Sequence, residues 1–126
     1  MSGFFVKIEE KTLKNNYFRK VIFTGKHSQL VLMSLKKGEE IGSEVHKTVD
    51  QFFRIEKGEA KVVAGNITKK VREDEAFVIP AGTKHNVINT GKKELKLYTI
   101  YSPANHPDKT IHKTKKEAEK YEESHH

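Results

Sequence analysis

A short stretch near the middle of the chain, residues 38–58, constrains the fold most strongly. It reads GEEIGSEVHKTVDQFFRIEKG and places Glu44 and His46 two residues apart, with Gln51 shortly after them. Side chains two residues apart in a strand point to the same face of a sheet, so Glu44 and His46 can be directed at one point. Gln51 lies beyond a turn. It reaches the same point only if the chain folds back as a hairpin.

A second stretch, PAGTKHNVIN, follows further along the chain. Pro80 and Gly82 predict a turn there, because proline presets its φ angle and glycine adopts conformations that other residues rarely hold. His85 then opens a new strand. Two imidazoles, a carboxylate and an amide oxygen converging from two hairpins would form a first coordination shell for a divalent cation.

The two stretches resemble the paired motifs of the cupins. The first cupin motif reads G, five residues, H-x-H, three or four residues, E, six residues, G. The second reads G, five residues, P-x-G, two residues, H, three residues, N. The resemblance covers roughly residues 30–101, and the positions in register are Gly38, Glu44, His46, Gln51, Gly58, Pro80, Gly82, His85 and Asn89. Asp74 stands where the second motif begins with glycine.

The chain departs from the family pattern at two ligand positions. Glu44 stands at the first histidine position and Gln51 stands at the glutamate position. The usual shell of three histidines and one glutamate therefore becomes Glu44, His46, Gln51 and His85. Both shells sum to one negative charge, so the resemblance implies a rebuilt metal site rather than a lost one.

The fourth ligand has an alternative in the neighbouring residue. Counting back from Gly58 places Gln51 on the inward face and Asp50 on the outward face, and a slip of one residue would exchange them. A β-bulge at this point would make Asp50 the ligand instead. We expect Gln51.

The spacing of turn signals predicts an all-β fold. Runs of four to eight residues rich in aromatic and β-branched side chains are separated by Gly- and Asn-containing turns, which is typical of an antiparallel sandwich or barrel. The resemblance to cupins implies a double-stranded β-helix, or jelly roll. The expected strands are residues 4–8, 17–24, 29–36, 51–55, 60–64, 67–71, 76–79, 85–89 and 94–101, followed by a short C-terminal helix that begins with a capping box at Thr114 and Glu117.

Length and composition define the remaining bounds. The chain has 126 residues, which suits a single domain with a barrel core at about 17–103, a tail and helix at 104–123, and a probable tag remnant at 124–126. There is no cysteine, so a metal must be held by histidine, carboxylate or amide groups. Without a signal peptide or a membrane-spanning apolar run, the expected compartment is the cytoplasm.

The net charge of +7 comes mainly from lysine pairs spread along the chain, with arginine only at positions 19, 54 and 72. Nucleic-acid surfaces use arginine-rich patches interleaved with aromatic residues. The dispersed lysines instead suit turns and edge strands that must resist aggregation. We therefore expect neither a nucleic acid nor a membrane as a partner.

The pattern also suggests which ions and pocket residues to expect. An N₂O₂ ligand set without sulfur suits Zn²⁺, Fe²⁺, Mn²⁺ or Ni²⁺, and zinc is the ion we expect to find bound. Phe53, Phe77, Val87, Tyr98 and His106 are candidate substrate-pocket residues. His27 and His112 fit no ligand spacing and are expected at the surface or the rim of the pocket.

Three functions are compatible with such a site. The first is a metal-dependent enzyme on a small oxygen-rich substrate, similar to cupin sugar-phosphate isomerases or, with iron, to dioxygenases. The second is a binding or sensing module in which a small ligand completes the metal shell. The third is a structural cation that pins the hairpins together. We also expect a homodimer, with residues 4–8 or 17–24 at its interface.

Overall fold

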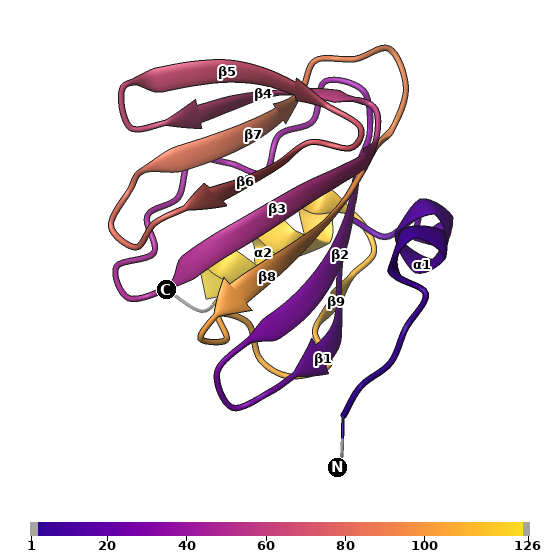
Figure 1. Ribbon diagram of the computed structural model, residues 1–126, viewed down its shortest axis with the longest axis vertical. Helices are drawn as coiled ribbons and strands as arrows, with labels where there is room; N and C mark the ends of the chain where they lie inside the picture. The colour runs from indigo at the N-terminus through magenta and orange to yellow at the C-terminus, as the bar shows by residue number, and fades with distance from the viewer. Residues whose placement is uncertain (1–2, 125–126) are drawn as a thin grey trace.

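The computed structural model describes residues 3–124, which form two facing β-sheets with a helix at each end of the chain (Figure 1). The all-β, antiparallel fold with a short C-terminal helix confirms the predicted class. The strands are β1 (Arg19–Thr24), β2 (Gln29–Leu35), β3 (Asp50–Lys57), β4 (Glu59–Ala64), β5 (Ile67–Arg72), β6 (Ala76–Ile79), β7 (His85–Asn89), β8 (Leu95–Ser102) and β9 (Ile111–His112). The helices are α1 (Ile8–Lys14) and α2 (Lys115–Ser124).

The larger sheet has the strand order β6-β3-β8-β2-β1-β9 and the smaller one the order β5-β4-β7. All of the strand pairs are antiparallel. The segment between β2 and β3 runs alongside β7, with isolated bridges between Glu40 and Ile88 and between Glu44 and His85. This segment extends the smaller sheet by one irregular strand, and it carries two of the predicted ligands.

The core lies between the two sheets. Along β3 the side chains alternate, with Gln51, Phe53 and Ile55 buried and Phe52 and Arg54 less so. Alternate residues of a strand share a face, so these three side chains enter the interior together. The other core residues include Val31, Met33, Leu35, Ala60, Val62, Val87, Leu95, Leu97 and Tyr101.

Asp74 takes the place of the first glycine of the second motif. Its φ angle is +74°, a left-handed conformation that aspartate adopts more readily than most residues. Its backbone N–H donates to the Ile55 carbonyl at 2.9 Å, and its carboxylate forms an ion pair with Arg54 at 3.1 Å. The turn is therefore preserved with a different residue.

The N-terminal region was predicted incorrectly. Residues 4–7 form no strand, and Ile8 begins helix α1. Glu9 and Glu10 lie in its first turn and Lys14 in its last, the arrangement that the helix dipole favours. The Phe4 ring instead stacks on Phe23 with centroids 5.0 Å apart. The homodimer stays a prediction, but a strand at 4–8 cannot form its interface.

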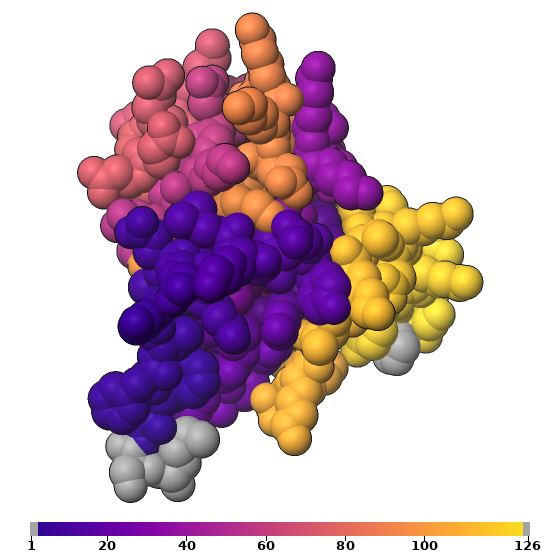
Figure 2. Space-filling view, turned by 90° about the vertical axis from the view of Figure 1, so that its right-hand side faces the viewer, coloured from indigo at the N-terminus to yellow at the C-terminus, as the bar shows by residue number. Residues whose placement is uncertain are grey.

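The C-terminal region is more closely packed than its sequence suggests. β9 pairs with β1, and Ala118 on α2 is buried in the core cluster. The predicted cap is present, since the Glu117 backbone N–H donates to Thr114 Oγ1 at 3.1 Å. Figure 2 shows α2 and the preceding segment covering one side of the barrel. Of the predicted tag remnant, His125 and His126 lie outside the described residues. No helix within residues 3–124 is long and apolar enough to cross a membrane.

Replacing Leu97 with alanine should destabilise the fold by about 2–5 kcal/mol, because its side chain is fully buried between the sheets and the cavity would not close completely. Urea unfolding measures this change. Lys69→Ala on the exposed face of β5 is the control and should change stability by less than about 0.5 kcal/mol. Equal effects of the two variants would contradict this placement of the core.

Candidate metal centre

Backbone pairing holds the predicted ligands together. The Glu44 N–H donates to the His85 carbonyl and the His85 N–H donates to the Glu44 carbonyl, both at 2.9 Å. The Gly82 N–H donates to the His46 carbonyl at 2.8 Å. The turn that resembles the second motif is thus bonded directly to the loop that resembles the first.

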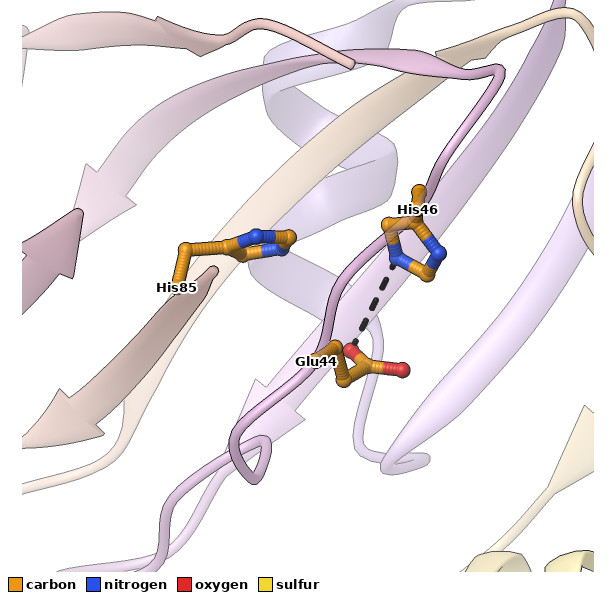
Figure 3. A group of neighbouring side chains, drawn as sticks. All are labelled: Glu44, His46 and His85. Atoms are coloured by element: carbon orange, nitrogen blue, oxygen red, sulfur yellow. Dashed lines mark ion pairs between the residues drawn. The ribbon is translucent and has the colours of Figure 1, made fainter. Parts of the chain in front are cut away.

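Glu44, His46 and His85 converge on one point (Figure 3). One potential ligand atom from each of the three side chains lies within 4.8 Å of the others. The Glu44 Oε1 to His46 Nε2 distance is 4.0 Å, and the two imidazole centroids are 5.4 Å apart. These separations exceed hydrogen-bonding distance and leave room between the donor atoms for an ion.

The donor atoms are buried without partners. His46 Nε2, His85 Nε2 and Gln51 Oε1 are buried and make no hydrogen bond. The Nδ1 atom of His85 lies 2.9 Å from the Thr83 carbonyl, and a carbonyl only accepts, so Nδ1 carries the proton. The lone pair of His85 is therefore on Nε2, the tautomer that a metal requires.

Gln51, rather than Asp50, has the inward position. Its side chain is 1% exposed and its Nε2 donates to Thr99 Oγ1 at 2.9 Å. Thr99 Oγ1 donates its single proton to the Phe52 carbonyl at 2.8 Å, so it must accept from the Gln51 amide. This fixes the orientation of the amide and leaves Oε1 free. The exposed Asp50 carboxylate instead accepts from the Ala81 N–H at 2.9 Å.

Burial shapes the electrostatics of this cluster. It raises the pKa of Glu44, an effect that Arg19 partly opposes. It lowers the pKa of His46, and His85 lowers it further. Buried polar atoms without a hydrogen-bond partner are costly in a folded protein. Two imidazole nitrogens with side-chain oxygens form a ligand set that a divalent transition metal accepts. The residues present therefore fit such an ion.

A cavity of about 850 Å³ opens beside the cluster. Glu44 and His46 lie in its wall, as do Arg19 from β1, His106 from the segment after β8, and residues of α2. Its size falls in the range of roughly 300–1,000 Å³ that is usual for small-molecule sites. The cluster therefore has one side facing a space that a ligand can enter.

Four of the five predicted pocket residues do not line this cavity, whereas His106 does. Phe53 and Val87 belong to the core, and Phe77 stacks on Phe53 with centroids 4.7 Å apart. Tyr98 lies on the opposite face of β8, where its ring packs near Phe52 at 6.2 Å. The reason is the period of two along the strand: Leu97, Thr99 and Tyr101 point inward, so Tyr98 points outward.

Three residues near the site were not singled out from sequence. Tyr101 is fully buried and its ring meets His46 edge-on with centroids 5.8 Å apart. Arg19 is 4% exposed and lies 3.2 Å, through Nη1, from His112 Nδ1. His112, which was expected at the surface or the rim of the pocket, is itself buried. The alternation along β8 could have indicated that Tyr101 points inward. No sequence pattern predicted β9, which brings His112 to Arg19.

The hydrogen bonds of Tyr101 define the protonation of His106. Burial raises the pKa of Tyr101, while Arg19 and Gln51 donate to its hydroxyl oxygen. Its own proton is then available to His106 Nε2, which lies 3.2 Å away. Burial, followed by the charge of Arg19, lowers the pKa of His106 to about 3. His106 is therefore a neutral imidazole at physiological pH, facing the cavity.

Residues 31–101 match the family model described as cupin domain. The chain belongs to the cupin family. This confirms the resemblance of the two motifs, and it assigns the facing sheets to the double-stranded β-helix of that family.

Several relatives are similar over most of the chain. The uncharacterized protein YrkC of Bacillus subtilis is 53% identical over 91% of this chain, and the uncharacterized protein L612 of Acanthamoeba polyphaga mimivirus is 55% identical over 81%. The chain spans 65% and 66% of the lengths of these relatives, less than two thirds of each. The crystal structure of BH2720 from Bacillus halodurans superimposes with a TM-score of 0.92 at 46% identity, covering 93% of each chain.

Replacing Thr99 with valine should weaken zinc binding about 10–100-fold, because the Gln51 amide would lose the acceptor that orients its oxygen. Competition with a chromophoric chelator measures the Kd. Thr68→Val, on the exposed strand β5, is the matched control and should leave the Kd unchanged. If both variants bound zinc like the unaltered protein, Gln51 would not be a ligand held by Thr99.

The neutral state of His106 predicts a sensitivity to acid. Its pKa is about 3 in the folded chain and about 6.5 when unfolded. The unfolded state then binds more protons below pH 6.5, so stability is retained above that pH and falls as the pH is lowered toward 3. At pH 5 the loss is on the order of 2 kcal/mol.

His106→Asn should therefore lose less stability between pH 7 and pH 5 than the unaltered protein. Thermal unfolding of chelator-treated protein at the two pH values measures this, so that metal release does not contribute. His27→Asn, at an exposed histidine, should retain the full loss. An unchanged pH dependence in His106→Asn would show that His106 does not stay neutral on folding.

Proposed function

We propose that this cupin is a divalent-metal-dependent enzyme that acts on a small, oxygen-rich molecule. The observation that carries the proposal is the pair of buried atoms without partners, His46 Nε2 and His85 Nε2, which lie together with the Glu44 carboxylate beside a cavity. Gln51 Oε1, the predicted fourth ligand, is likewise buried without a partner. A purely structural cation would favour a sealed site. The neighbouring cavity favours a site at which a substrate meets the metal.

The donor set favours iron for the working enzyme. Two histidines and one carboxylate with open positions are typical of non-haem iron(II) oxygenases, and Gln51 adds a neutral oxygen to that set. A bound metal would supply Lewis-acid polarisation of substrate oxygens and, with iron, reaction with dioxygen. Zinc, which fits the same donors, would support the first kind of chemistry only.

The protein's own groups would position the substrate and handle protons. His106 faces the cavity as a neutral imidazole and lies 3.2 Å from the Tyr101 hydroxyl. With Nε2 accepting from Tyr101, the Nδ1–H group of His106 can donate a hydrogen bond to an oxygen of a bound substrate. Tyr101 holds the ring in place, and residues of α2 form part of the cavity wall.

The same metal site and cavity favour a second candidate, an isomerase that moves a proton between adjacent carbons. In this alternative a metal held by Glu44, His46, Gln51 and His85 would polarise neighbouring substrate oxygens, and the His106 Nδ1–H group would donate a hydrogen bond to one of them. It does not require dioxygen. A binding or sensing module without turnover remains the alternative outside enzymes, and it has the same metal site.

An open coordination position can be tested without knowing the substrate. Iron(II) is added anaerobically to protein purified without an affinity tag, and nitric oxide, a probe for the dioxygen position, is then introduced. The proposal predicts a half-integer-spin electron paramagnetic resonance signal accounting for about one iron per chain. His85→Ala, which removes a buried donor, should lose most of this signal, whereas His27→Ala should retain it.

Turnover separates the two enzyme classes and the binding module. Iron-loaded protein is screened against small hydroxy acids, oxo acids and sugar acids with an oxygen electrode and by proton exchange in deuterated buffer. Dioxygen uptake supports an oxygenase and exchange alone supports an isomerase. Stoichiometric binding with neither signal would assign the site to binding, and a failure to bind iron or zinc at all would contradict the proposal.

A further inference from the structure

Arg19 presents a buried positive charge to the same cavity. Its side chain is 4% exposed, yet it lies in the cavity wall together with Glu44 and His46. A guanidinium stays charged in proteins, and a buried charge is costly unless it is paired with an opposite one. The partners of Arg19 therefore indicate what the cavity is built to hold.

Within residues 3–124 the Arg19 side chain makes its hydrogen bonds and ring contact with uncharged groups, while its charge also acts on the Glu44 carboxylate. Nη1 lies 3.2 Å from His112 Nδ1, the side chain donates to the Tyr101 hydroxyl, and the guanidinium lies over the Phe18 ring at 5.3 Å. Nε is buried with no hydrogen-bond partner. None of the ion pairs formed among these residues includes Arg19.

These contacts also fix the orientation of the guanidinium. His112 Nδ1 must accept, because arginine only donates, and burial lowers the pKa of His112 as an accepting imidazole requires. The Tyr101 hydroxyl oxygen accepts a hydrogen bond from another N–H group of Arg19. The planar fork is therefore held in position from one side, and the Glu44 carboxylate is an opposite charge on which it acts.

We propose that Arg19 is the receptor for a carboxylate of the substrate, so that the substrate is a small monocarboxylic acid lying between Arg19 and the metal centre. The inference rests on the proposed function, since the same cavity would hold the reacting part of the molecule. Guanidinium and carboxylate are matched in shape and form paired, charge-assisted hydrogen bonds. Arg19 acts here as a specificity-determining residue.

The rest of the cavity wall explains why a carboxylate fits better than a phosphate. Beside Arg19 it contains one other cation, Lys115, against five glutamates, Glu40, Glu44, Glu119, Glu122 and Glu123. A dianion would be repelled by this acidic wall. A single carboxylate paired with Arg19 introduces one charge at the one place where it is compensated.

The Arg19 Nε–H group gives a direct measurement. The chain has arginine only at positions 19, 54 and 72, so the arginine Nε–H region of a ¹⁵N-labelled sample holds three signals and Arg54 and Arg72 serve as internal references. The full chain, zinc-loaded and zinc-free in separate samples, is titrated with pyruvate, with its neutral analogue pyruvamide, and with inorganic phosphate.

We expect pyruvate to shift the Arg19 signal and to bind at least tenfold more tightly than pyruvamide or phosphate. Arg19→Met should abolish that preference and Arg19→Lys should reduce it, while Lys115→Gln should change the pyruvate Kd less than about threefold. The comparison of the three ligands on the unaltered protein stands even if Arg19→Met fails to fold.

Equal binding of pyruvate and pyruvamide, an unmoved Arg19 signal, or tighter binding of phosphate would overturn the proposal. The measured zinc content separates this inference from the proposed function. A chain that binds pyruvate through Arg19 but takes up no zinc would contradict the metal enzyme and support the carboxylate receptor. A chain that binds zinc but shows no preference for pyruvate would do the reverse.

Discussion

The reciprocal backbone hydrogen bonds between Glu44 and His85 are the constraint on which the site depends. They join an irregular segment of the chain to β7 and bring together two motifs that are far apart in sequence. A slip of one residue in this pairing would turn one set of donors away from the other. The bond from Gly82 to the His46 carbonyl restrains the same pairing from the side of the turn.

Around this pairing the structure accumulates polar groups that its core does not satisfy. Most buried polar atoms in proteins have a partner, yet His46, His85, Gln51 and Arg19 each retain a buried atom without one. The His46 and His85 atoms lie where the ligands converge, Gln51 Oε1 belongs to the predicted fourth ligand, and the last atom belongs to a guanidinium in the adjoining cavity wall. The imidazole and amide atoms can bind a cation, and the Arg19 guanidinium can bind an anion. This is the arrangement expected around a metal and an acidic substrate.

Much of the fold and of the metal centre could be predicted from the sequence. The strands from β1 to β8 follow from alternating apolar residues and turn signals, and the inward position of Gln51 followed from counting along β3. The family motif also located Asp74, whose left-handed backbone was not foreseen but serves the purpose of the missing glycine. Local patterns were sufficient here because each prediction depended on residues close together in the chain.

Predictions failed where tertiary contacts decide. A strand was predicted at residues 4–8 because they are aromatic and β-branched, but residues 4–7 form no strand and helix α1 begins at Ile8. Tyr98 was expected in the pocket, but the alternation along β8 points Tyr101 inward and Tyr98 outward. Arg19 and His112 come together because β9 pairs with β1 over two residues, and the buried Gln29 side chain holds the backbone of His106. Neither contact carries a sequence signal. The place of Arg19 in the cavity wall, on which the proposed substrate depends, could therefore not be predicted from the sequence.

X-ray absorption spectroscopy of the metal-loaded protein, purified without an affinity tag, shows whether both imidazoles bind one ion. We expect one metal per chain, with a first shell of nitrogen and oxygen near 2.0–2.2 Å for zinc and multiple-scattering features of two imidazoles. His46→Ala and His85→Ala should each remove one imidazole contribution. A shell without imidazole, or one unchanged in both variants, would show that the two motifs do not meet at a metal.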